Sequence, residues 1–92
     1  MLTRKPKYKI GTLLRNKNAV ERDSPLLEQV MIVRTYVIMG QTTTHEGLVV
    51  ENEVRMYDLM YLGDKGKKAP QTERALDILI RDKKMEVVAT PN

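Results

Sequence analysis

The chain of 92 residues contains no cysteine, no phenylalanine and no tryptophan, and it has a single histidine. The absence of cysteine excludes disulfides, thiol nucleophiles and thiolate metal sites, and it fits a reducing compartment. We therefore expect a cytoplasmic protein. Because tyrosine is the only aromatic residue, the core must be built from aliphatic side chains and methionine.

Long hydrophobic runs are also missing. The apolar stretches 30–33 and 36–39 are interrupted by Arg34 and fall far short of the roughly 20 residues that span a bilayer, so no membrane partner is expected. With 41% hydrophobic and 30% charged residues, the composition is typical of one small folded domain. We assign residues 8–92 to that domain and residues 1–7, which Pro6 interrupts, to a flexible basic arm.

Catalytic chemistry has little support in the sequence. The pair His45-Glu46 stands in a polar segment, but there is no second histidine to complete a metal site or to orient a nucleophile. The expectation is therefore a protein without catalytic residues, metal ligands or cofactors.

Charge is sorted along the chain. Residues 1–17 carry six bases and no acid, residues 18–62 carry seven acids against three bases, and residues 63–84 carry seven bases against four acids. Basic ends around an acidic centre favour contact with a polyanion. The residues predicted to contact nucleic-acid phosphates are Arg4, Lys5, Lys7, Lys9, Arg15, Lys17, Lys65, Lys67, Lys68 and Arg74.

Hydrophobic spacing and capping signals predict a mainly helical α+β fold. A helix is expected over 25–39 after Ser24-Pro25, another over 52–62, and a third over 70–84 that begins at Pro70. Short strands are expected at 8–14 and 85–90, where they can pair with each other. This order is compatible with a helix-turn-helix or winged-helix layout.

A second fold remains open. The many β-branched residues between Val30 and Ile38 also suit a buried strand, and periodicity alone does not separate the two readings. The alternative is a small β-rich domain in which 30–39 and 48–61 are strands.

An excess of apolar residues in the acidic centre indicates a partner surface, most simply in a homodimer. Its predicted residues are Met31, Val33, Tyr36, Val37, Met56 and Met60. The functional hypothesis is a small dimeric nucleic-acid-binding protein that acts in transcription or replication control. The alternative is a protein-interaction adaptor or inhibitor module that docks on a protein partner through its acidic, methionine-rich central segment.

Overall fold

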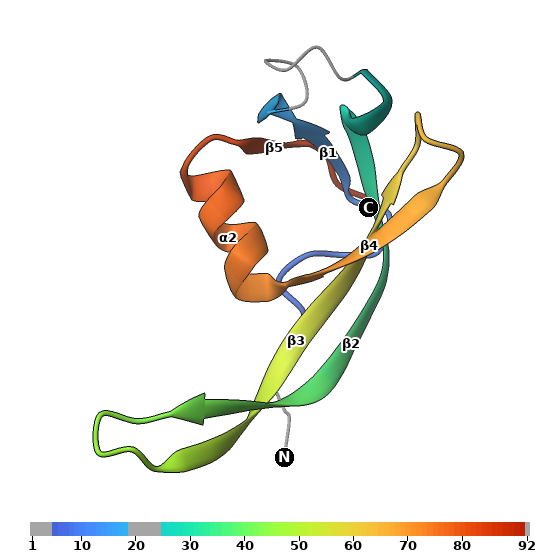
Figure 1. Ribbon diagram of the computed structural model, residues 1–92. Helices are drawn as coiled ribbons and strands as arrows, with labels where there is room; N and C mark the ends of the chain where they lie inside the picture. The colour runs from blue at the N-terminus through green and yellow to red at the C-terminus, as the bar shows by residue number, and fades with distance from the viewer. Residues whose placement is uncertain (1–4, 19–24, 92) are drawn as a thin grey trace.

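The computed structural model describes residues 5–18 and 25–91 and shows a mainly β protein. One antiparallel sheet has the strand order β4-β3-β2-β1-β5, and the helix α2 connects β4 to β5 (Figure 1). The elements in chain order are β1 (Leu13–Asn16), the 3-10 turn η1 (Pro25–Leu27), β2 (Gln29–Thr43), β3 (Val49–Tyr61), β4 (Lys67–Thr72), α2 (Glu73–Arg81) and β5 (Met85–Ala89).

The predicted mainly helical fold is wrong. Of the segment 25–39 only η1 is helical, the remainder belongs to β2, and the segment 52–62 belongs almost entirely to β3. The structure corresponds to the β-rich alternative, whose expected strands over 30–39 and 48–61 are observed as β2 and β3. The helix-turn-helix and winged-helix layouts fall with the helical fold, because α2 is the one α-helix whose bounds lie within the described residues.

A β-bulge explains why β2 did not read as a strand. Val30 and Ile32 point into the core, but the register shifts between Ile32 and Arg34, so that Thr35 and Val37 take over the inward side. One inserted residue breaks the period of two that identifies a strand. The remaining apolar positions then fall, by coincidence, on a spacing typical of a helix.

The C-terminal third was predicted more closely. The expected helix over 70–84 contains α2, which begins at Glu73 because the Thr72 hydroxyl accepts from the Ala75 amide at 3.0 Å as an N-cap. Pro70 belongs to β4 rather than to the helix. The strand β5 pairs antiparallel with β1, although β1 begins at Leu13 instead of residue 8.

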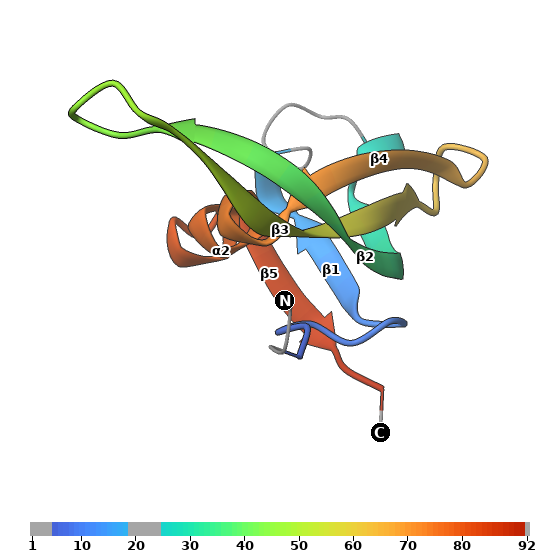
Figure 2. The same ribbon diagram turned by 90° about the horizontal axis from the view of Figure 1, so that it is seen from below.

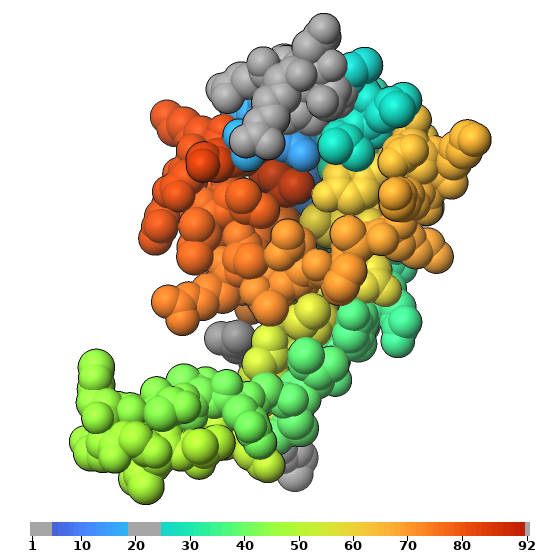
Figure 3. Space-filling model, viewed as in Figure 1, coloured from blue at the N-terminus to red at the C-terminus, as the bar shows by residue number. Residues whose placement is uncertain are grey.

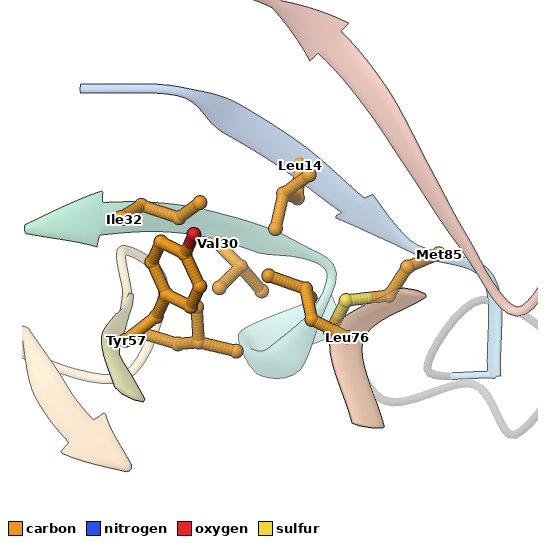
Figure 4. Packing of buried hydrophobic residues seen from close by; sticks show 7 residues of the cluster. Leu14, Val30, Ile32, Tyr57, Leu76 and Met85 are labelled. Atoms are coloured by element: carbon orange, nitrogen blue, oxygen red, sulfur yellow. The ribbon is translucent and has the colours of Figure 1, made fainter. Parts of the chain in front are cut away.

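The core lies between one face of the sheet and α2. Its buried side chains come from every strand except β4, and α2 contributes Leu76 as its one buried residue (Figure 4). In the view turned by 90°, β2, β3 and β4 arch over α2 and β5 (Figure 2). The buried hydrophobic residues are Leu14, Val30, Ile32, Tyr57, Leu59, Leu76 and Met85.

The β2–β3 hairpin extends well beyond this body. Pairing of β2 with β1 ends at Met31, and pairing of β3 with β4 ends at Met56, whereas β2 and β3 remain paired to Thr43 and Val49. From here on, the arm means residues 38–54 and not residues 1–7, and the body means the rest of the molecule. The arm projects from the body in the space-filling view (Figure 3). The Cα radius of gyration, 14.8 Å, exceeds the roughly 12 Å expected for a compact chain of this length.

Candidate nucleic-acid interface and projecting arm

Three of the predicted N-terminal cations pair with carboxylates of the folded body. Lys7 Nζ lies 3.0 Å from Asp77 Oδ1, and Lys17 Nζ lies 2.9 Å from Glu86 Oε2. Arg15 Nε donates to Glu28 Oε1 at 3.1 Å. The contact with Lys17 lowers the pKa of the Glu86 carboxyl. Lys5 and Lys9 are exposed, and Arg4 lies outside the described residues.

Two tyrosines fasten part of this basic start to α2. The Tyr57 hydroxyl donates to Glu73 Oε2 at 2.5 Å and accepts from the Tyr8 amide at 3.2 Å, while the Tyr8 hydroxyl donates to Asp77. The two rings meet edge to face, with centroids 5.6 Å apart. Burial, reinforced by the carboxylates, raises the pKa of Tyr57 to about 12 and raises the pKa of Tyr8 as well. These contacts hold residues 7 and 8 against the body, and we call these two residues the strap.

The tight turn between β3 and β4 presents three exposed lysines. Lys65 and Gly66 both adopt positive φ, 55° and 72°, and the Lys67 amide closes the turn by donating to the Asp64 carbonyl at 3.0 Å. We call Lys65, Lys67 and Lys68 the basic turn. Among the residues that the structure describes, no carboxylate forms an ion pair with any of these three side chains. Asp64, in the same turn, leaves this segment with a formal charge of +2.

Arg74, the last of the predicted phosphate contacts, lies apart from the basic turn. It is exposed in the first turn of α2, beside the arm's base rather than at the β3–β4 end. Sequence reasoning left out Lys83 and Lys84, which are exposed where α2 gives way to β5. Their position at the end of a predicted helix was the available signal, since a helix C-terminus favours cations. Figure 1 places this turn and the basic turn at the end of the molecule away from the arm's tip.

The arm differs in charge from everything else in the chain. It contains Glu46, Glu51 and Glu53 but no lysine or arginine, so its formal charge is −3. Because the whole chain carries +4, the remaining residues carry +4 − (−3), or +7. Five large apolar side chains on the arm are exposed: Ile38, Met39, Leu48, Val49 and Val50.

Four of the six residues predicted as a partner surface are brought together by the sheet. Met31 is directly opposite Met60, and Tyr36 is opposite Met56, so all four side chains share the face of β2 and β3 that is turned away from the core. On that face Arg34 stacks over the Tyr36 ring at 4.5 Å and lies 3.8 Å from Asp58. Val33 and Val37 are separate from these four, and Val33 is separate because it occupies the bulge.

Val37 is paired with Arg55 and lies on the opposite face from Tyr36. The structure therefore brings four of the six predicted residues together on a sheet face instead of a helix face, and it separates the other two.

His45 and Glu46 are exposed at the arm's tip, where the Gly47 amide donates to the Thr44 carbonyl at 3.0 Å. Within residues 5–18 and 25–91, no three His, Asp or Glu side chains are grouped so that they could hold a metal ion. In the same ranges, no helix is long and apolar enough to cross a bilayer.

Comparison of the chain with protein-family models, with curated proteins and with solved structures gave no match.

Proposed function

We propose that this protein is a small, non-enzymatic nucleic-acid-binding protein that holds phosphates with its basic turn and acts by occupancy in transcription or replication control in the cytoplasm. One observation supports it above the others: the body uses its carboxylates internally and leaves the lysines of the basic turn exposed without an ion pair to a described residue.

The carboxylates outside the arm are largely engaged. Glu28, Asp58, Asp77, Asp82 and Glu86 each lie in an ion pair, and Glu73 accepts from Tyr57. In each ion pair, the cation neutralises part of the negative field with which the carboxylate would repel a phosphate. The three lysines of the basic turn, gathered within four residues, therefore offer a concentrated positive charge to a polyanion.

Binding of this kind fixes position without reading sequence, because lysines on a turn contact backbone phosphates more readily than base edges. If each of the three lysines neutralises one phosphate of a duplex, the logarithm of the binding constant should fall with the logarithm of salt concentration with a slope of about −2.7. The test is fluorescence anisotropy of a labelled random duplex and a labelled single strand, titrated with the protein at two salt concentrations. No binding to either at low salt would refute the proposal.

A second candidate function rests on a different observation, the exposed apolar arm. A protein-interaction module that docks through this acidic central segment would need no phosphate contact. Substitution of Val49 and Val50 with serine should then abolish its binding to the partner and leave the folded body intact, as circular dichroism would report.

A further inference from the structure

The arm is a two-stranded ribbon, and within residues 5–18 and 25–91 no further strand pairs with either of its edges. A hairpin of this kind is marginally stable in water unless a third strand or a packed face supports it. Here the side facing the core continues outward as Met39, Gln41 and Thr43 on β2, opposite Glu53, Glu51 and Val49 on β3. This inner side of the arm therefore combines exposed apolar groups with negative charge: Met39 is 61% exposed and Val49 is 64% exposed.

A groove with the opposite charge runs along α2. It is an open hollow of about 690 Å³ between the strap and the helix, and its lining residues include Arg74, Ile78 and Arg81. The only carboxylate in the lining, Asp77, is engaged by Lys7 and Tyr8. Arg81 pairs with Asp82, which lies outside the lining, at 3.3 Å, and Arg74 has no ion pair to a described residue. Ile78 is 37% exposed and supplies an apolar floor between the two arginines. The groove is thus basic and partly apolar, as a partner of the arm's inner side should be.

The same molecule cannot bring its own arm into this groove. Ladder pairing between β2 and β3 continues to Thr43 and Val49, which keeps the arm extended. The tip stands apart from α2 in the space-filling view (Figure 3), and the arm's base, at residues 52–54, lines a hollow with Arg55 and the N-terminus of α2.

We propose that the arm of one copy docks in the α2 groove of a second copy, and that the second copy's arm returns the contact. The charges favour this occupant, because an arm of −3 meets a body of +7. Arm-to-arm pairing would instead bring like charges together. A reciprocal contact is closed and isologous, so it yields a dimer and not a filament. It does not depend on phosphate binding by the basic turn, which neither surface includes.

Charge reversal in two separate proteins tests the contact. Variant X carries Glu51→Lys and Glu53→Lys on the arm, and variant Y carries Arg74→Glu and Arg81→Glu on the groove. All four side chains are on the surface, and Arg74→Glu places a negative charge in the first turn of α2, where the helix tolerates it. Sedimentation velocity at several concentrations would be recorded for the wild type, for X, for Y and for an equimolar mixture, with circular dichroism as the folding control.

The proposal predicts that the wild type is a dimer and that X and Y alone dissociate at least tenfold more readily, since each opposes like charges. The mixture should restore the dimer, because the arm of X then meets the groove of Y and the arm of Y meets the groove of X. A wild type that remains monomeric at high concentration overturns the second copy as occupant and leaves a different protein as the arm's partner. Dimers of X and Y that are as stable as the wild type, or a mixture that stays monomeric, overturn the arm-to-groove contact. DNA binding by a variant in which Lys65, Lys67 and Lys68 become alanine, which leaves both docking surfaces unchanged, reports on the basic turn separately from the dimer.

The chain's lack of cysteine allows a direct distance test of the same contact. Chains whose only change is Gln41→Cys, on the inner side of the arm, are mixed with chains whose only change is Ile78→Cys, in the groove. A short bis-maleimide should then crosslink the two into a heterodimer. Lys67→Cys, in the basic turn, is the matched control and should not crosslink to Gln41→Cys. Efficient crosslinking of Gln41→Cys to itself would overturn the groove as the docking site.

Discussion

Lys7 Nζ and Asp77 Oδ1 lie 3.0 Å apart, which places a residue expected to contact nucleic acid against the helix α2 of its own chain. The Lys7 amide also donates to Glu73 Oε2 at 3.2 Å. A surface ion pair of this kind contributes little to stability. Together with the tyrosine contacts of the strap, however, it directs the basic start of the chain along the body, which is why the proposed phosphate contact is assigned to the β3–β4 turn instead.

The strap should make the protein sensitive to alkaline pH. The pKa of Tyr57 is raised from 10.0 to about 12 in the folded protein, so the folded state keeps its hydroxyl proton where the unfolded chain loses it. The stabilisation is complete below pH 10 and is lost as the pH rises towards 12. In urea unfolding between pH 9.5 and 11.5, the wild type should lose stability more steeply than Tyr57→Phe, because only the wild type has the Tyr57 hydroxyl. Both proteins titrate the same lysines, so the lysines do not contribute to the difference between the two slopes. Equal slopes would contradict the buried hydroxyl network.

The packing of α2 on the sheet depends on Leu76, which is fully buried. Leu76→Ala should lower the free energy of unfolding by about 2–5 kcal/mol, because the cavity it leaves is bounded by the sheet and cannot easily collapse. Val88→Ala, at a position 53% exposed, is the control and should change the same free energy by less than about 1 kcal/mol. Urea denaturation followed by circular dichroism measures both, and similar losses would argue against the described core.

Gly63 should resist substitution for a steric reason. A Cβ at this position would lie 3.0 Å from the Leu26 carbonyl oxygen and 3.1 Å from Leu26 Cα, in the turn η1. Backbone atoms yield less than the end of a side chain, so Gly63→Ala should separate η1 from the end of β3 and cost about 1–3 kcal/mol. A thermal unfolding midpoint equal to that of the wild type would show that the two segments are not in close contact.

The sequence was informative where one face of an element is apolar and the other polar. Within 70–84 the helix α2 has Leu76 inward and Arg74 and Arg81 outward, and its period was legible. The sequence pattern did not identify β2 and β3 as strands, because both of their faces carry apolar residues. In β3, Tyr57 and Leu59 enter the core, while Met56 and Met60 lie on the outer face. Alternation is then invisible, and the bulge at Val33 removes what remains of it.

The candidate sites were predictable in part for a related reason. Residue type shows where cations are, and the basic turn was identified from Lys65, Lys67 and Lys68 alone. Ion pairing is a property of the fold, so neither the neutralisation of Lys7, Arg15 and Lys17 nor the exposure of the arm could be obtained from the sequence.

The most direct test of phosphate binding by the basic turn is the salt dependence of duplex affinity for two matched triple variants. In the first, Lys65, Lys67 and Lys68 become alanine; in the second, Lys7, Arg15 and Lys17 become alanine, so both lose three formal charges. The account predicts that the first variant binds more weakly and that its salt slope is smaller than the wild-type slope by about 2.7, whereas the second keeps a slope close to the wild-type value. A slope that falls in the second variant and is unchanged in the first would contradict the account.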